Sequence, residues 1–307
     1  MRRKVFAIGE TLLDIIFERH QVKAAKPGGS MLNSSVSLGR AGIDVSLISE
    51  FGNDQTGKLI LEFLKNNNVQ TQNTYLYDDG KTPLAMAFLN EKGDASYDFY
   101  KPYPEERLQV KIPGFTPNDI LIFGSFYSID PKVRAKLIEI VKAAQSAGSM
   151  IIYDPNFRKP HAHELELLKP FIVENMQIAH IIRASNEDVK NIFDEDTIQG
   201  LQNSIQGQNK ILIMTSSSEK VELLRNNRYD VYPVPEIKVV STIGAGDNFN
   251  AGLIYGLIRN KVTTSNLNQV TQEKWKEIIS LSMSFSANVC MGMENYISED
   301  FAGRMER

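Results

Sequence analysis

The chain has 307 residues, of which 42% are hydrophobic and 23% are charged, and its formal net charge is −3. This length and composition predict a soluble protein of one large domain with a sizeable core. The weakly acidic balance, without any basic block, excludes an electrostatic nucleic-acid binder, and the single cysteine, Cys290, excludes an internal disulfide framework and fits a cytoplasmic location. No apolar run reaches the length of a membrane span, and we interpret the start of the chain as a strand rather than a signal peptide.

Short apolar runs alternate with segments of helical spacing along most of the chain. The expected buried strands are 5–9, 45–52, 119–124, 149–154, 178–185 and 210–216. Helical spacing fills 31–42 and 130–148, and the second segment begins with Asp130 as an N-cap and Pro131 at the first helical position. Strands that alternate with helices predict βαβ units and a mostly parallel sheet covered on both faces.

Two segments depart from this alternation. Residues 82–100 predict a hairpin, because two β-rich arms flank the turn-forming residues NEKGD. Residues 14–29 predict another extended excursion. We therefore expect a single α/β domain over 1–307, with a small sheet built by excursions at about 12–28 and 80–103 that could act as a lid.

The stretch STIGAGDNFNAG, residues 241–252, carries the strongest candidate chemistry. A strand-like run ends in a glycine turn and a helix starts near Asp247, so backbone N–H groups and the positive end of a helix dipole could meet an anion. Gly244 and Gly246, with Ala245 between them, let the backbone approach a phosphate. The stretch matches neither the Walker A nor the GxGxxG pattern. Asp247 is a candidate general base, although a glycine turn alone is more often structural.

Other polar residues and glycines also follow predicted strands, where ligands of an open parallel sheet gather. Asp14, and Asn33 one turn after Gly28 and Gly29, could hydrogen-bond a polyol, and Asp154, Asn156 and Arg158 could hold a substrate or the water shell of an ion. Each has a structural alternative. A lone Asp14 is usually a solvated loop residue, a glycine pair before a helix is also a plain turn with an N-cap, and Asp-Pro-Asn also builds a turn.

Taken in order, seven motifs resemble those of the ribokinase-like carbohydrate kinases, the PfkB family, and most closely its fructokinase branch. The motifs are GETLLD, KPGGSMLNSSVSLGRAG, FGNDQTG, TPLAMAFL followed by YDFYK, YDPNFR, SNED and STIGAGDNFNAGL. The resemblance covers nearly the whole chain. It implies a Rossmann-like three-layer α/β/α ribokinase-like fold with a small β-sheet lid. It also implies Mg²⁺-assisted transfer of the ATP γ-phosphate to a hydroxymethyl group of a small sugar, with fructose as the expected acceptor.

The resemblance also implies roles for individual residues. Asp247 would be the catalytic base, and the anion hole would consist of Gly244, Ala245 and Gly246. The expected sugar-binding residues are Asp14, Gly28, Gly29, Asn33, Asp247 and Arg158, the last also near the phosphate, with Tyr97 and Phe99 from the lid. The expected nucleotide-side residues are Asn186, Thr215, Ser217, Lys220, Gly244, Gly246 and Asn288. Mg²⁺ would be organised through water by Glu187 and Asp188.

Three departures from the family pattern lie on the nucleotide and metal side. Ser241 replaces an aspartate that helps to hold a monovalent cation in relatives, so K⁺ is a doubtful cofactor. Val189 stands where the family's Asn-x-x-Glu element has its glutamate. Ser217 and Lys220 replace two glycines of the nucleotide turn, and Lys220 either contacts the triphosphate or points to solvent.

Several alternatives to a fructokinase stay open. A 2-keto-3-deoxygluconate kinase has similar motifs, and another sugar or nucleoside kinase of the family is a further candidate. From another class, a non-catalytic sugar-binding regulator would explain the departures, but the retained Asp247 and its two flanking glycines argue against it. The expected partners are a small sugar and ATP, with no nucleic acid or membrane. By analogy the lid sheet could form a homodimer, or it could cover only the active site.

Overall fold

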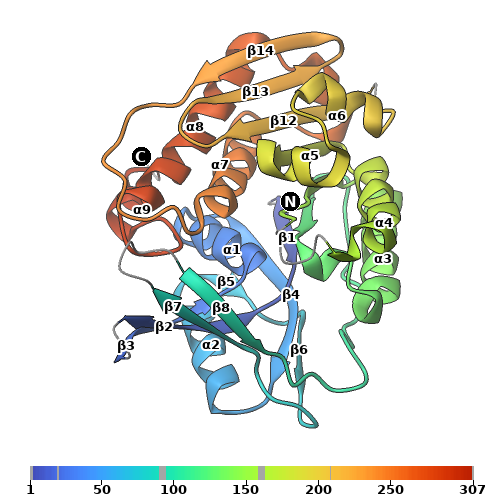
Figure 1. Ribbon diagram of the computed structural model, residues 1–307. Coiled ribbons are helices and arrows are strands. Elements are labelled where there is room, and N and C mark those ends of the chain that lie inside the picture. The colour runs from blue at the N-terminus through green and yellow to red at the C-terminus, as the bar shows by residue number, and fades with distance from the viewer. Residues whose placement is uncertain (1–2, 19–20, 90–94, 158–162, 208, 306–307) are drawn as a thin grey trace.

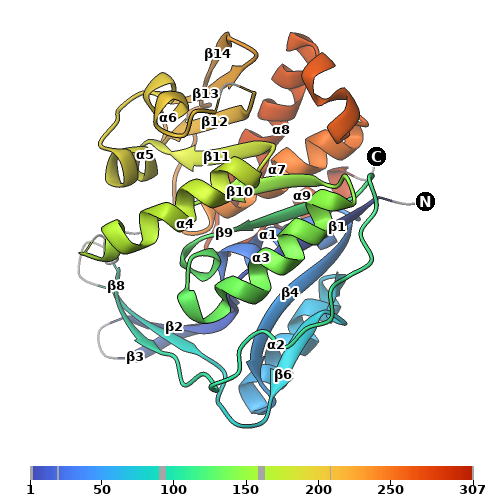
Figure 2. The same ribbon diagram turned by 90° about the vertical axis from the view of Figure 1, so that its right-hand side faces the viewer.

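The computed structural model describes residues 3–18, 21–89, 95–157, 163–207 and 209–305. The described chain forms two sheets, and helices cover both faces of the larger one (Figure 1 and Figure 2). This arrangement agrees with the α/β layers expected from the alternation of apolar runs and helical segments. Among the described helices, none is both long enough and apolar enough to cross a bilayer.

The larger sheet has the strand order β14-β13-β12-β11-β10-β9-β1-β4-β5, with β6 also paired to β4. The bounds are β1 (Lys4–Ile8), β4 (Asp44–Gly52), β5 (Val69–Gln70), β6 (Thr74–Tyr77), β9 (Ile120–Gly124), β10 (Met150–Asp154), β11 (Ile181–Ser185), β12 (Ile211–Ser216), β13 (Lys220–Arg225) and β14 (Arg228–Pro233). The pairs from β12 to β5 are parallel, and β12, β13 and β14 pair antiparallel. Strands β9 and β10 are buried along their whole length because helices lie on both sides.

The smaller sheet has the order β3-β2-β7-β8 and lies beneath α1 in Figure 1. Its strands are β2 (Leu12–Glu18), β3 (Gln21–Gly28), β7 (Leu84–Leu89) and β8 (Ala95–Tyr100). The two excursions expected from the sequence therefore pair with each other through β2 and β7. The expected hairpin is the antiparallel β7–β8 pair, and its turn residues 90–94 lie outside the described residues.

The helices pack as two groups, one against each face of the larger sheet. One group comprises α1 (Ser30–Arg40), α2 (Gln55–Asn66), α7 (Ala245–Arg259), α8 (Gln272–Cys290) and α9 (Glu299–Met305). The other comprises α3 (Pro131–Ser146), α4 (Leu165–Ile178), α5 (Asn186–Phe193) and α6 (Ile198–Ser204). Two short 3₁₀ helices, η1 (Phe126–Ser128) and η3 (Thr264–Gln269), complete the described helical elements.

The start of α3 follows the sequence signals that predicted it. The Asp130 carboxylate accepts a hydrogen bond of 3.0 Å from the backbone N–H of Lys132, and Pro131 occupies the first turn. A side-chain cap satisfies an otherwise unpartnered N–H group, and proline lacks the N–H that this position would leave unused. The predicted N-cap and first helical position are confirmed.

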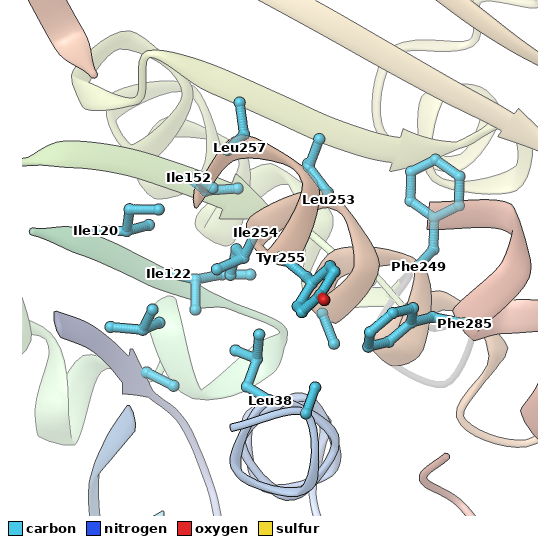
Figure 3. Close-up of a cluster of buried hydrophobic side chains, with 14 of the residues drawn as sticks. Leu38, Ile120, Ile122, Ile152, Phe249, Leu253, Ile254, Tyr255, Leu257 and Phe285 are labelled. Atoms are coloured by element: carbon cyan, nitrogen blue, oxygen red, sulfur yellow. The ribbon is translucent and has the colours of Figure 1, made fainter. Parts of the chain in front are cut away.

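Helix α7 runs through the centre of one core cluster (Figure 3). Its Leu253 and Ile254 are fully buried with Ile122 of β9, Leu38 of α1 and Phe285 of α8. Burial of an aliphatic or aromatic side chain of this size contributes about 1.5–3 kcal/mol. This packing fixes the position of α7, and therefore of the turn at its start.

Small residues bring α7 and α8 into close contact. A Cβ atom on Gly252 would lie 2.6 Å from the Cα atom of Ser282, so only glycine allows this approach. Trp275 of α8 is fully buried in the same core cluster.

Candidate active site

Helices α1 and α7 both begin at a glycine. Their N-caps are Gly29, with a φ of 126°, and Gly244, with a φ of 78°, and no side chain caps either helix. By contrast, the carboxylate of Asp54 caps α2 by accepting from the backbone N–H of Gly57. The first N–H groups of a helix have no partner within the helix, and the dipole there favours negative charge. The starts of α1 and α7 therefore suit an anion.

The Asp247 carboxylate joins these two helices. Its Oδ1 atom accepts a hydrogen bond of 2.6 Å from the Ser30 hydroxyl, and its Oδ2 atom accepts one of 2.8 Å from the Asn33 amide. The Ser34 hydroxyl also donates to the Asp247 backbone carbonyl at 2.8 Å. Asp247 is only 9% exposed, so α1 holds a nearly buried carboxylate in one orientation at the start of α7.

Asp14 supplies a second carboxyl beside this junction. Burial, with the negative charge of Asp247 as a further cause, raises the pKa of Asp14 to about 7. A Cβ atom on Gly28 would lie 2.0 Å from the Asp14 carboxylate, so the glycine is what leaves room for it. Two nearby carboxyls can share a polyol through its hydroxyl groups, as acceptors or, when protonated, as a donor.

Asn33 has one atom that its neighbours leave unpaired. Its amide nitrogen donates to Asp247, while its Oδ1 atom is buried and has no hydrogen-bond partner among the described residues. Buried polar atoms are nearly always paired in native proteins, so an orphaned acceptor marks a place for a donor. A sugar hydroxyl next to Asp247 is a donor of the right kind.

A buried polar cluster that the sequence did not predict lies against the glycine turn. Arg183 of β11 donates to Asp154 at 3.1 Å and to the Thr215 hydroxyl at 2.7 Å. Asn250 of α7 donates to the same Asp154 oxygen at 2.6 Å. A Cβ atom on Gly246 would lie 2.8 Å from Arg183 Nη1, so the guanidinium group packs directly on the turn. The sequence signal was a charged residue inside the apolar run IIRAS.

The residues that follow β10 form a turn, which is one of the two interpretations that the sequence allowed. The backbone N–H of Asn156 donates to Asp154 Oδ1 at 3.1 Å, and Asn156 has a positive φ of 38°. Asp154 is fully buried and also accepts from the Arg183 cluster. Arg158, expected near the sugar and phosphate, lies outside the described residues.

The expected metal residues differ in their surroundings. Glu187 and Asn186 are exposed, whereas Asp188 is buried and accepts from the backbone N–H groups of Phe157 and Ser185. Burial and the charge of Asp154 raise the pKa of Asp188. Val189 is buried in the core. In the part of the chain that the structure describes, no three acidic, histidine or cysteine residues gather in a way that could hold a metal.

The expected nucleotide residues are spread along the ends of β11, β12 and α8. Thr215 belongs to the Arg183 cluster, and Ser217 occupies the next turn with a positive φ of 44°. Lys220 Nζ lies 3.2 Å from Glu222 Oε2, and both line a hollow of about 420 Å³ together with Asn186. Asn288 is at a separate place, where its side-chain oxygen accepts from the backbone N–H of Ser298 at 2.9 Å.

Two aromatic rings lie on the face of the small sheet that also carries Asp14. Asp14 pairs with Ala85 of β7, and Ala85 pairs with Phe99 of β8, so these residues share one face. The rings of Tyr97 and Phe99 stack at 5.8 Å between centroids and are 42% and 54% exposed. The structure thus brings Asp14, Gly28, Gly29, Asn33 and Asp247 to one place, with the aromatic pair on the adjoining sheet. Ser30 and Arg183 are the neighbours that sequence reasoning missed.

The chain is similar to known proteins along most of its length. Residues 2–270 match the family described as pfkB family carbohydrate kinase. Fructokinase-2 from Oryza sativa subsp. japonica is 24% identical over 299 residues, which cover 92% of this chain and 87% of that protein.

Two solved structures share the fold. Aminoimidazole riboside kinase from Salmonella enterica, complexed with aminoimidazole riboside and an ATP analog, has a TM-score of 0.82 at 20% identity, with 99% of each chain covered. A double mutant of fructokinase from Vibrio cholerae O395, in a form that binds fructose, ADP and a potassium ion, has a TM-score of 0.84 at 18% identity, covering 99% of this chain and 98% of that one. The expected ribokinase-like α/β/α fold is confirmed.

Proposed function

This chain belongs to the pfkB family of carbohydrate kinases, and from that premise we propose that it transfers the γ-phosphate of ATP to a hydroxymethyl group of fructose. One observation carries the proposal: the Asp247 carboxylate lies where two glycine-capped helix starts meet, beside Asp14 and the orphaned acceptor of Asn33. Fructose as the acceptor draws on the fructokinase names of the relatives.

In the proposed reaction, Asp247 acts as a general base. Its carboxylate takes the proton of the acceptor hydroxyl while the hydroxyl oxygen forms a bond to the γ-phosphorus. The bond between that phosphorus and the β,γ-bridging oxygen breaks, and ADP leaves. The backbone N–H groups of 244–246 stabilise the negative charge on the transferring phosphoryl group, and the Arg183 guanidinium group, which is paired with Asp154, supports the turn from behind.

The residues present fit Mg²⁺ that arrives with the nucleotide. Magnesium is commonly held by one or two carboxylates, substrate phosphates and several waters, so it needs no protein cage. Glu187 is exposed beside Asn186 and could reach the water shell of the ion, whereas Asp188 is buried and already accepts from the backbone N–H groups of Phe157 and Ser185. When bound, the ion neutralises phosphate charge. A K⁺ requirement is not expected, because Ser241 offers no carboxylate for the cation, and its hydroxyl accepts from the Ile243 backbone N–H within the turn.

The charges around the site favour a neutral sugar over a sugar acid. In the described part of the chain, Lys101 pairs with Glu10 at 2.8 Å and Lys26 pairs with Glu294 at 2.8 Å. A substrate carboxylate would have to displace Glu10 or Glu294 to pair with either of these two lysines. This supports fructose over 2-keto-3-deoxygluconate as the acceptor.

The test is a coupled ADP-release assay over a panel of acceptors with MgATP. Fructose should give the highest kcat/KM among fructose, ribose, 2-keto-3-deoxygluconate and a nucleoside. Another preferred acceptor would overturn the fructose assignment. Sugar binding without ADP release from any acceptor would favour the non-catalytic regulator.

The role of Asp247 has its own test. Asp247→Asn keeps the size of the side chain but removes its basicity, so kcat should fall by roughly 10²–10⁴-fold, the range of general acid–base catalysis. The KM for fructose should change little. Near-normal turnover in this variant would remove Asp247 as the base.

A further inference from the structure

Ser30 is the first residue of α1, and its hydroxyl crosses to α7 instead of capping its own helix. The hydroxyl donates to Asp247 Oδ1 at 2.6 Å, while Asn33 donates to Oδ2 at 2.8 Å. The two contacts come from residues three positions apart, which lie on one face of a helix. Both oxygens of the Asp247 carboxylate are therefore held by the first turn of α1.

The backbone before Ser30 fixes where its hydroxyl can reach. Gly29 has a φ of 126°, and a Cβ atom there would lie 2.2 Å from the Glu10 carbonyl oxygen. Gly28 packs in the same way against the Asp14 carboxylate. The fold thus holds residue 30 in position through its two neighbours, and the Ser30 side chain needs only one rotamer to meet Asp247.

Two donors, one on each oxygen, fix the plane of the Asp247 carboxylate. The last torsion of an aspartate side chain is broad, so a carboxylate held on one side alone can turn. An ionised carboxylate has about four lone-pair sites. The bonds from Ser30 and Asn33 use two of them, one on each oxygen.

We propose that Ser30 is a positioning residue, which orients the Asp247 carboxylate toward the acceptor hydroxyl and so sets the rate of phosphoryl transfer. The proposal rests on the proposed function, because it acts through Asp247 as the base. Ser30 itself does not take the proton. Because rates are sensitive to misplacement of a reacting group by about 1 Å, loss of the Ser30 hydroxyl should slow the chemical step more than it weakens binding.

The experiment compares Ser30→Ala, Ser30→Thr and Ser35→Ala with the unaltered protein, in single-turnover phosphorylation with MgATP. The acceptor is fructose, or the sugar that the panel shows to be fastest. Ser35 is the matched control, because it lies in the same helix, is fully buried, and its hydroxyl donates only to the Met31 carbonyl at 2.7 Å. Thermal unfolding of each variant checks the fold.

Ser30→Ala should lower the single-turnover rate by roughly 10- to 100-fold, the cost of losing a hydrogen bond to a charged group. The KM values for sugar and ATP should stay within about 3-fold of those of the unaltered protein. A change of that size is no larger than the loss of one exposed contact would cause. Ser30→Thr keeps the hydroxyl and should recover most of the rate, and Ser35→Ala should match the unaltered protein.

Other results would overturn the proposal. These are an unchanged rate in Ser30→Ala, a change confined to sugar KM, a Ser30→Thr variant as slow as Ser30→Ala, or an equal loss in Ser35→Ala. If Ser30→Ala does not fold, Ser30→Cys replaces it, with an intermediate rate expected from its weaker donor and an unchanged rate counting against the proposal. Absence of ADP release by the unaltered protein with every acceptor of the panel would instead defeat the proposed function, so the two failures are distinct.

Discussion

The carboxyl of Asp14 binds its proton more tightly in the folded protein than in the unfolded chain. Burial and the charge of Asp247 raise its pKa to about 7 from an ordinary value of 3.8. Between these values the folded state holds more protons than the unfolded state, so the free energy of unfolding should fall as pH rises from about 4 to about 7. Above about pH 7 this contribution should be constant.

Asp14→Asn should remove that fall, because an amide does not titrate. The measurement is urea unfolding of both proteins at intervals from pH 5 to pH 8. The difference in unfolding free energy between the variant and the unaltered protein should change over this range. Asp194→Asn is the control: Asp194 is exposed, and Lys190 lowers the pKa of its carboxyl, so its titration falls below this window. A difference for Asp14→Asn that does not change with pH would show that Asp14 titrates normally.

Residues of the site were predictable where a motif carried them. Asp14, Asn33 and Asp247 were named from sequence, and the structure brings them together. Ser30 and Arg183 were not, because no motif gave them a role and their contacts form only in the folded chain: Ser30 meets Asp247 across 217 positions and Arg183 meets Asp154 across 29. No local spacing announces such a contact, and a serine after two glycines is unremarkable in sequence.

At the scale of helices and strands, the glycine face of α7 sets how closely α8 can approach. Gly252→Ala would place a methyl group 2.6 Å from the Ser282 Cα atom, which requires the helices to separate. Overpacking of this kind costs about 1–3 kcal/mol, more than the roughly 1 kcal/mol that alanine gains over glycine in helix propensity. The variant should therefore unfold at lower urea concentration.

Gly303→Ala is the matched control, because Gly303 lies in α9 with open space around it. There the helix propensity should act alone and raise the unfolding free energy by up to about 1 kcal/mol. The two variants are thus expected to change stability in opposite directions. The same direction in both would mean that α7 and α8 can adjust to the added methyl group.

Strands were predictable where both faces are buried. The expected runs at 119–124 and 149–154 match β9 and β10, which are buried along their whole length and apolar up to the Asp154 that ends β10. The hairpin of β13 and β14 was missed, because polar residues alternate along it and no continuous apolar run exists. Its signal was Asn226-Asn227, which have φ values of 45° and 60° and connect the two strands, as is typical of a tight hairpin turn.

At the scale of the whole molecule, an ion pair ties the small sheet to the segment that follows α8. Lys26 of β3 donates to Glu294 at 2.8 Å and to the Met293 carbonyl at 2.9 Å. Lys26→Gln should raise the sugar KM by about 1.4- to 5-fold, because a partly exposed pair contributes about 0.2–1 kcal/mol to holding the sheet in place.

Lys23→Gln tests whether the link between the two parts matters. Lys23 lies on the same strand and pairs with Glu18 at 2.9 Å, but both residues belong to the small sheet. In steady-state assays at low salt, the sugar KM of Lys23→Gln should equal that of the unaltered protein. Equal effects of the two variants would argue for a general charge effect on the sugar site instead of a link between the sheets.

Burial of Trp275, the single tryptophan, has an optical consequence. The indole belongs to the cluster that α1, α7 and α8 form on one face of the large sheet, whereas α3 to α6 pack on the other face. Its emission therefore follows the exposure of one half of the core, while far-ultraviolet circular dichroism follows both halves. Coincidence of the two signals during unfolding would establish that the halves melt as one cooperative unit, and a lag between them would reveal that one face of the sheet loosens first.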